Sequence, residues 1–556
     1  MARDRRRLGA VAVVVTTVAV QLLSAFHALG GDDIYVLANV RSGAWSRRLF
    51  AFNLDTPAPA YMPWWTGQVL QRRFIRVPAS ALIWLESELF GSRSVPYHLV
   101  TLALLAGSCL LLFLLLSRRV PLPTAMLVAL VPALHPAAAE VVGSLCCQPI
   151  ATAGLFSVGA VAAWERLRKR PSAMAIGGVV LLSTLAVTSY EAAVVLPVFL
   201  VLADVLLGAP EASTSRRWGP RLAVLSVLVA YLPCAMAIRR GLVAPDTTPV
   251  RPLGEVLLAL RYDSVAYVCK ALGLYDPTEP GTYWLPARVG EPLAVATVVG
   301  LLAAAVWLAR RSKLALAGLA GFALFLAPPL LTRAAVSGLN FPTLRQLYLP
   351  VLLGAPALLV ALAGARLRWR VIAPIAAWAA ALAAESVIAG ASLAIDRDER
   401  GVAASTEHIL AGVPAGSTVV AVGDYLCGFA PSLVWSGPST LGIPGDSDAP
   451  GPRLTAVDEH TLIARSEAGF DVRAEVETAQ REPGVNRGPA WIPLQPVELA
   501  VRGRQRIDGA TVTLEARDGG RITGLRYAFD RPLAEMVFLR FRGCSVPERM
   551  VVEPAP

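Results

Sequence analysis

Long apolar runs, separated by short polar segments, fill the chain up to about residue 394. A helix needs roughly twenty apolar residues to cross the hydrocarbon core of a bilayer, and runs of this kind predict about eleven spans. The expected spans are 8–29, 95–116, 121–134, 149–164, 173–189, 192–208, 221–238, 291–309, 314–333, 346–364 and 371–394. The third and fourth are short and bounded by proline, so one of them could be re-entrant or broken.

The polar segments between the runs alternate in character. One set is short and rich in arginine and lysine, and the positive-inside rule places it in the cytoplasm. It comprises the N-terminus and residues 117–119, 165–170, 215–221, 310–313 and 366–370. The other set then faces the periplasm or the cell exterior, and it comprises residues 30–94, 135–148, 189–191, 239–290, 334–345 and everything after 394. We therefore expect a multi-pass protein of the cell inner (plasma) membrane.

After residue 394 the apolar positions change to a period of two. Alternating runs at 418–422, 497–501, 511–514 and 536–539 are separated by Gly, Pro and Asp, a pattern typical of strands joined by turns. The sequence predicts an α-helical polytopic membrane domain over residues 1–394 and an extracytoplasmic, mainly-β domain over residues 395–556. The second region shows no period of about 34 residues, which excludes a tetratricopeptide array.

Composition agrees with this class. The 556 residues are 55% hydrophobic and 16% charged, with a mean hydropathy of +0.55, and these values exclude an ordinary soluble protein. The net charge of +11 comes mainly from the segments that set topology. Because no basic stripe is interleaved with aromatic residues, we expect no nucleic-acid partner. The first apolar run is long for a signal peptide and lacks a clear cleavage site, so we expect an uncleaved helix.

Seven cysteines are scattered along the chain, with no CxxC and no spacing typical of metal ligands. Cys146 and Cys147 are adjacent, which is a poor geometry for a structural disulfide. Cys427 and Cys544 lie in the C-terminal region and could pair if that region is extracytoplasmic.

Polar residues gather at the ends of the spans on the predicted outer face. Asp32 and Asp33 follow the first run directly, and carboxylates near hydrocarbon are costly enough to suggest a function; the alternative is a solvated helix end. Arg345, at the start of a span, is placed to meet an anion at the bilayer surface. The same face offers further candidates, namely Arg76, His98, His135, Glu140, Tyr190, Glu191 and Tyr348. The alternative is a purely structural role, in which these carboxylates and arginines pair with one another.

Five short motifs follow one another along this face. They are Asp32-Asp33 after the first run, Leu-Phe-Gly-x5-Tyr-His at 89–98, Leu-His-Pro-x3-Glu-Val-Val at 134–142, Tyr-Glu-x5-Pro-x6-Asp at 190–204, and Arg-x2-Tyr-Leu-Pro at 345–350. In this order they resemble the GT-C membrane glycosyltransferases over residues 1 to about 365. The resemblance is closest to the O-mannosyltransferase branch, which usually carries tetratricopeptide repeats; those repeats are absent here.

The resemblance implies an enzyme that takes a sugar from a polyprenyl-phosphate carrier and transfers it, with inversion, to an extracytoplasmic protein or glycan hydroxyl. It implies that Asp33 or Asp32 is the catalytic carboxylate. By the same resemblance Arg345, Arg76 and Tyr348 bind the donor phosphate, while His135, Glu140, Tyr190, Glu191 and His98 line the cavity. The chain departs from the family in two places. The family often has Gly-Arg where this chain has Cys146-Cys147-Gln148, and Ser-Lys-Glu where it has Ser189-Tyr190-Glu191.

The residues fit this chemistry independently of the resemblance. Transfer to a hydroxyl needs a base to take its proton, and of the two aspartates we favour Asp33 slightly. Negative charge grows on the leaving lipid phosphate, where arginines or a divalent metal ion, Mg²⁺ or Mn²⁺, would stabilise it. Asp32 and Asp33 are the candidate metal ligands, and the apolar spans supply a groove for the polyprenyl tail among membrane lipid.

Other readings of the sequence stay open. A transporter or flippase of lipid-linked saccharide would place its charges near the bilayer midplane and often shows two similar halves. An inactive GT-C-like scaffold that binds polysaccharide, or a polysaccharide ligase or polymerase, would keep the same motif order.

Overall fold

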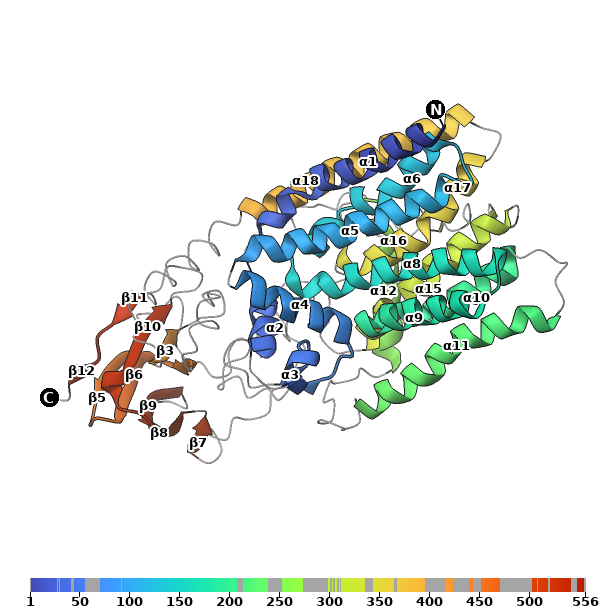
Figure 1. Ribbon diagram of the computed structural model, residues 1–556. Coiled ribbons are helices and arrows are strands. Elements are labelled where there is room, and N and C mark those ends of the chain that lie inside the picture. Colours follow the sequence, from blue (N-terminus) through green and yellow to red (C-terminus); the bar gives the residue numbers. More distant parts are fainter. Residues whose placement is uncertain are drawn as a thin grey trace.

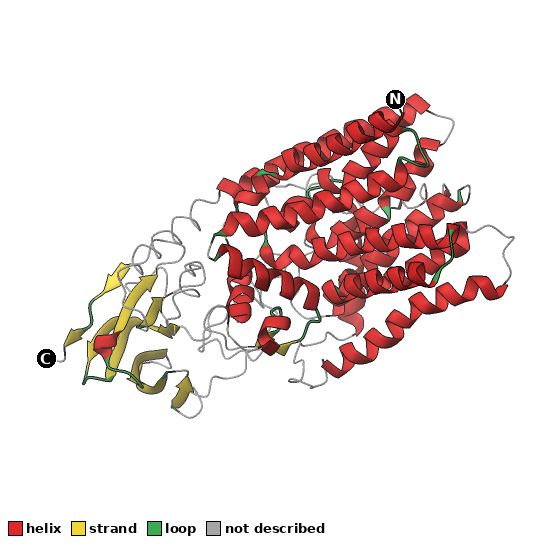
Figure 2. Cartoon of the chain, viewed as in Figure 1, coloured by secondary structure: helices red, strands yellow, loops and turns green. Residues whose placement is uncertain are grey.

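The computed structural model of the protein describes residues 2–27, 29, 31–41, 45–55, 71–91, 93–207, 214–238, 253–273, 299–300, 303, 306–307, 310, 312–335, 344–364, 368–395, 417–423, 440–443, 452–470, 503–507, 509–518, 521–541 and 548–554. Helices make up the N-terminal part and strands the C-terminal part (Figures 1 and 2).

The long helices form a bundle. Among the described residues, four helical segments are long and apolar enough to span a membrane. They lie within α5 (Ser94–Leu116), η3 (Leu145–Cys147) with α8 (Gln148–Lys169), α11 (Thr214–Ala237) and α15 (Lys313–Ala335). They coincide with the expected spans 95–116, 149–164, 221–238 and 314–333. The multi-pass character of the protein is thereby confirmed.

The expected count of about eleven spans is not confirmed. The apolar helices α6 (Leu122–Leu134) and α9 (Ala173–Ser189) are shorter than a full span. The expected span 291–309 lies largely outside the described residues. Among the described residues, the bundle also contains α1 (Ala2–Gln21), α7 (Ala137–Val142), α10 (Leu196–Leu207), α12 (Leu253–Ala271), α16 (Tyr348–Leu353), α17 (Ala355–Gly364) and α18 (Arg368–Ile395).

The first and last helices of the bundle lie side by side, as α1 and α18 do in Figure 1. Gln21 joins them, because its amide donates one 2.6 Å hydrogen bond to the Ser386 hydroxyl and another to the carbonyl of Ala133 on α6. Polar groups in an apolar surrounding are stable only when paired. This one side chain therefore ties three helices that are far apart in sequence.

A sharp bend interrupts the expected span 346–364, whose two helices are apolar enough to form one broken span together. The helical segment that begins with η6 (Leu344–Leu347) and continues as α16 is bent by 48° against α17. Gly354 lies at the break, and a Cβ atom there would come within 2.5 Å of the Phe322 Cα on α15. Only glycine permits this close approach of two backbones. The bend places η6, with Arg345, at one end of the bundle.

Short helices cover that end of the bundle. They are η1 (Leu23–Phe26), α2 (Gly31–Arg41), α3 (Trp45–Leu49), α4 (Val77–Phe90) and η4 (Glu191–Val195), with a small hairpin of β1 (Leu54–Asp55) and β2 (Gln71–Arg72). The helix α4 begins with Pro78 in its first turn, where the missing N–H has no partner to lose. It ends at Gly91, whose φ of 59° lies in the left-handed region.

The C-terminal strands form two sheets. The four-stranded sheet has the order β11-β10-β3-β4 and comprises β3 (Thr418–Gly423), β4 (Thr440–Ile443), β10 (Met536–Phe541) and β11 (Glu548–Met550). The six-stranded sheet has the order β12-β5-β6-β9-β8-β7 and comprises β5 (Arg453–Ala456), β6 (Thr461–Phe470), β7 (Arg504–Ile507), β8 (Ala510–Asp518), β9 (Arg521–Phe529) and β12 (Glu553–Pro554). In the first sheet β3 runs parallel to both neighbours; in the second β6, β9, β8 and β7 are antiparallel.

Alternation along β3 and β10 gives the small sheet two apolar faces. Val419 and Leu539 pack with Leu37 of α2 and Leu145 of η3. The residues that alternate with them along each strand point to the opposite face of the sheet. One of these, Val420, belongs to the core shared with the six-stranded sheet. Because successive side chains of a strand alternate between faces, the β region is anchored directly on the helices that cover the end of the bundle.

The strands expected at 418–422, 511–514 and 536–539 fall within β3, β8 and β10, and the run 497–501 lies outside the described residues. Helix α18 ends at Ile395 and β3 begins at Thr418. The domain limits 1–394 and 395–556, and the extracytoplasmic side of the second, stay predictions.

Candidate functional site

Asp33 is a buried carboxylate on α2, with 2% of its surface exposed. Its Oδ1 atom accepts a 2.7 Å hydrogen bond from the backbone N–H of Cys146 and a 3.1 Å bond from the Ser144 hydroxyl. Both donors belong to the turn between α7 and α8, 111 and 113 residues away. Hydrogen bonds of this kind favour the ionised form of a carboxylate and fix its orientation. The side chain of Asp32 lies outside the described residues.

Arg345 lies on the other side of the same turn. Its backbone N–H donates a 2.6 Å hydrogen bond to Oε2 of Glu140 on α7. Its guanidinium Nη1 is 3.5 Å from the Cys147 sulfur and 3.9 Å from the Cys146 sulfur. The structure therefore brings together three of the expected residues, Asp33, Glu140 and Arg345. We call this group, with the Ser144–Cys147 turn that joins it, the acid–arginine cluster.

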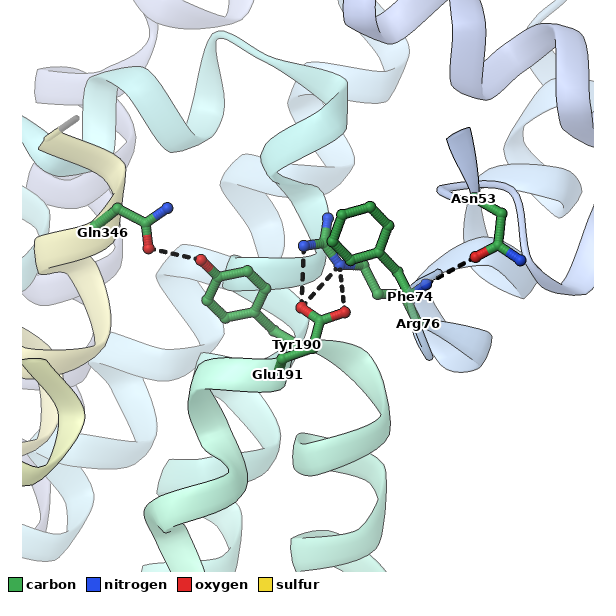
Figure 3. A network of polar contacts seen from close by, with 6 residues as sticks. All are labelled: Asn53, Phe74, Arg76, Tyr190, Glu191 and Gln346. Atoms are coloured by element: carbon green, nitrogen blue, oxygen red, sulfur yellow. Dashed lines mark hydrogen bonds and ion pairs between the residues drawn. The ribbon is translucent and has the colours of Figure 1, made fainter. Parts of the chain in front are cut away.

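A second polar group, drawn in Figure 3, adjoins the cluster. Arg76 faces Glu191, with three Nε and Nη2 to Oε distances of 3.0–3.1 Å. Its guanidinium also stacks 4.5 Å from the Phe74 ring centroid and 5.1 Å from that of Tyr190. Burial alone would lower the pKa of Arg76, but the Glu191 carboxylate outweighs it and raises the pKa above its ordinary value. The expected pairing of outer carboxylates with arginines is realised here.

Tyr190 connects the two groups. Its hydroxyl donates a 2.7 Å hydrogen bond to Oε1 of Gln346, the neighbour of Arg345 (Figure 3). Burial raises the pKa of the Tyr190 phenol, and Arg76 opposes this only in part. A phenol with a raised pKa stays protonated at neutral pH and keeps donating this bond. On the other side, the backbone N–H of Phe74 donates to Oδ1 of Asn53 at 2.7 Å, which holds the segment before α4 in place.

Glu86 is a residue that the sequence reasoning missed. It is 3% exposed on α4, and its Oε1 accepts a 2.8 Å hydrogen bond from the amide of Gln148, which directly follows Cys147. Burial raises the pKa of Glu86 to about 8, so its carboxyl is largely neutral at pH 7. A sequence signal was available, since Glu86 shares a helical face with Ala79 and Ile83, both buried.

The three other expected residues lie deeper in the bundle. Tyr348 is 1% exposed, and its ring packs at Gly154 of α8, in the apolar core. His135 is fully buried; its Nδ1 accepts from the Ala137 N–H at 3.1 Å, so Nε2 donates to the Lys270 carbonyl at 3.2 Å. His98 is also fully buried, with its ring 6.4 Å from that of His27. A role for these three in donor binding or in the cavity stays a prediction.

The fit of the cluster to a metal ion can be judged from its donors. Among the described residues, no three or more His, Cys, Asp or Glu side chains gather in a way that could hold a metal ion. Of the two expected ligands only Asp33 is described, and one carboxylate does not make a metal centre. Metal binding by Asp32 and Asp33 therefore stays a prediction. Cys427 and Cys544, the pair of cysteines that could form a disulfide, lie outside the described residues.

Comparison with known proteins yields structural likeness only. No protein-family model and no curated sequence matches the chain. Among solved structures the chain is similar to ArnT from Cupriavidus metallidurans bound to undecaprenyl phosphate, with 12% identity, coverage of 78% of this chain and 85% of that chain, and a TM-score of 0.45. It is also similar to the archaeal oligosaccharyltransferase AglB from Archaeoglobus fulgidus in complex with an inhibitory peptide and a dolichol-phosphate, with 14% identity, coverage of 79% and 64%, and a TM-score of 0.41. Likenesses this distant assign no activity.

In chemical terms, the Ser144–Cys147 turn contacts both a buried carboxylate, Asp33, and a guanidinium, that of Arg345. Such a pair can take a proton at one point and stabilise negative charge at another.

Proposed function

We propose that the protein is a membrane glycosyltransferase that takes a sugar from a polyprenyl-phosphate-linked donor and transfers it to a hydroxyl on the extracytoplasmic face of the membrane. One observation carries the proposal. Asp33, a carboxylate buried at the end of a bundle of apolar helices, is held by two hydrogen bonds on the turn that also contacts Arg345. The order of motifs in the sequence supports the same class of enzyme.

Asp33 acts as the general base in this proposal. The acceptor hydroxyl must lose its proton as its oxygen attacks the anomeric carbon of the sugar. The hydrogen bonds from Cys146 N–H and the Ser144 hydroxyl favour the ionised carboxylate and fix its orientation. A base that is already oriented needs no reorganisation when the reaction takes place, which is the source of much of the rate enhancement by polar groups in enzymes.

Arg345 stabilises the leaving phosphate. Attack on the anomeric carbon breaks the bond to the lipid phosphate oxygen, and negative charge grows on that oxygen. A guanidinium offers several N–H donors in a plane that matches two phosphate oxygens. The Glu140 carboxylate binds the backbone N–H of Arg345 and leaves its side-chain position to be set by other contacts. Arg76 is the weaker candidate for the phosphate, because Glu191 already matches its charge.

The remaining attributes are proposals of the same kind. The donor tail lies among the apolar helices and membrane lipid, and the acceptor comes from the extracytoplasmic side, where we place the β domain as well. We assign the enzyme to the O-mannosyltransferase branch of GT-C enzymes with an inverting reaction, on the motif order alone. A divalent metal ion bound by Asp32 and Asp33 would add charge stabilisation at the phosphate.

The experiment is a donor test with the full-length protein purified in detergent. It is incubated with polyprenyl-phosphate-linked mannose, and with the glucose-linked analogue for comparison, in the presence of serine- and threonine-containing peptides or an oligosaccharide. We expect release of free polyprenyl phosphate together with a glycosylated acceptor. Movement of intact lipid-linked sugar across vesicle membranes, without release of the lipid phosphate, would replace this proposal with a flippase.

A further inference from the structure

Two adjacent thiols lie inside the acid–arginine cluster. The Cys146 and Cys147 sulfurs are 3.9 Å apart, and both contact the Arg345 guanidinium. The Ser144 hydroxyl is 3.1 Å from the Cys146 sulfur. The backbone N–H of Cys146 also donates a hydrogen bond to Asp33. The two sulfurs therefore belong to the turn that contacts both the carboxylate and the arginine.

The Arg345 guanidinium is a neighbour of both thiols. A neighbouring guanidinium stabilises a thiolate, and the thiolate is the nucleophilic form of cysteine. Cys146 is half-buried, whereas Cys147 is 1% exposed. The other described cysteines differ from this pair, because Cys109 and Cys269 are buried and Cys234 is exposed on α11. A partly exposed thiol with a second thiol beside it can react with a disulfide compound and then resolve the mixed disulfide as an internal bridge.

We propose that Cys146 and Cys147 form a reversible modification site for disulfide compounds, and that its oxidation inactivates the acid–arginine cluster; the second half of this statement rests on the proposed function. The Cys146 thiolate attacks one sulfur of the disulfide, forms a mixed disulfide, and releases the other sulfur as a thiolate that takes up a proton. Cys147 then loses its proton, attacks the Cys146 sulfur and releases the second thiol. The protein sulfurs lose two electrons in all, and the disulfide compound gains them.

Closing the bridge must move the turn. A disulfide bond is about 2.05 Å long, so the two sulfurs must approach well inside their present 3.9 Å separation. Adjacent Cα atoms are about 3.8 Å apart, below the usual disulfide range, so rotation of side chains alone does not suffice. The backbone of η3 has to change, and the Cys146 N–H leaves its place on Asp33. Arg345 loses the Cys146 thiolate as a partner in the same step.

The test uses the full-length protein in detergent with glutathione disulfide as the reagent. Peptide mapping by mass spectrometry follows each cysteine with time. We expect Cys146 to react first among the described cysteines and to end as a bridge to Cys147. In Cys147→Ser the glutathione should stay on Cys146 as a mixed disulfide, and in Cys146→Ser the bridge cannot form.

Two functional readouts accompany the mapping: binding of polyprenyl phosphate and transfer of sugar, each compared with the reduced form of the same protein. Oxidation should lower transfer by the wild-type protein on the order of a hundredfold, the loss expected when a reacting group is displaced by about 1 Å. Dithiothreitol should restore it. Transfer by the Cys146→Ser protein should not change with oxidation, whatever its starting rate.

Three results would overturn the proposal. Equal reaction rates for Cys146 and Cys234 would show that Cys146 is not especially reactive. A mixed disulfide that persists on Cys146 in the wild-type protein would remove the bridge. A bridged protein with unchanged sugar transfer and unchanged lipid-phosphate binding would show that oxidation does not inactivate the acid–arginine cluster. A protein that forms the bridge and loses lipid-phosphate binding, yet transfers no sugar when reduced, would contradict the proposed function and leave the modification site standing.

Discussion

Replacing Glu86 by glutamine should change how the stability of the protein depends on pH. The Glu86 carboxyl is buried on α4 beside Gln148, and burial raises its pKa from 4.5 to about 8. In the unfolded chain the group titrates near its ordinary value. Between about pH 5 and pH 8 the unfolded chain has therefore lost this proton while the folded protein still holds it.

The sign and size of the effect on stability follow from this difference in bound protons between the folded and unfolded protein. The contribution of Glu86 to stability is complete below about pH 4.5 and is lost as the pH rises toward 8. The loss is about 1.4 kcal/mol per pH unit, and about 3–5 kcal/mol over the whole interval. Glutamine has nearly the same shape and carries no proton to lose, so the Glu86→Gln protein should lack this part of the pH dependence.

The assay is the apparent melting temperature in detergent at one scan rate, measured from pH 5 to pH 8 for the wild-type protein and two variants. Glu88→Gln is the matched control, since Glu88 is exposed on the same helix. We expect the gap between Glu86→Gln and wild type to widen by several degrees in favour of the variant as the pH rises, while Glu88→Gln follows the wild type. Parallel curves for Glu86→Gln and wild type would refute a neutral, buried Glu86.

Three further predictions follow from particular contacts. Gly354→Ala should destabilise the protein by about 1–3 kcal/mol or more, because the added Cβ meets the Phe322 backbone, whereas Gly177→Ala, with open space around it, should be neutral or slightly stabilising; chemical denaturation compares them. Arg76→Met and Glu191→Gln should each lower stability by about 3 kcal/mol and the double variant by clearly less than their sum, and additive losses in this cycle would mean that the pair is not coupled. Arg345→Ala should raise the donor Michaelis constant strongly and Arg345→Lys should rescue it in part, since an ammonium cannot form the planar fork; unchanged donor kinetics in Arg345→Ala would remove the residue from the phosphate site.

Hydropathy along the sequence was enough to predict where two of the long helices begin and end. The ends of α5 and α15 lie within two residues of the expected spans 95–116 and 314–333, because the apolar content of a span is set by the membrane alone. The bend at Gly354 was beyond that kind of prediction. It depends on the backbone of Phe322 in another helix, and one glycine in an apolar run does not reveal which neighbour approaches it.

The candidate site was likewise predictable from the sequence only in part. The motif order placed Asp33, Glu140 and Arg345 on one face, and the structure brings them together around one turn. The partners of Asp33 could not be foreseen, because a serine hydroxyl and a backbone N–H carry no sequence signal of their contact with a residue more than a hundred positions away. Parallel pairing of β3 with β4 and β10 was equally hidden, since a period of two defines a strand and not its neighbours.

The central claim is that Asp33 is the base of a sugar transfer, and the most direct test is the turnover of Asp33→Asn beside Asp32→Asn at matched protein level. Asparagine keeps the shape of the side chain and its hydrogen bonds to the Ser144–Cys146 turn but cannot accept the acceptor's proton. We predict that Asp33→Asn lowers turnover by about a hundredfold to ten-thousandfold with donor affinity nearly unchanged. We predict that Asp32→Asn acts mainly on folding or on the donor Michaelis constant. Full turnover in both variants would contradict the glycosyltransferase account.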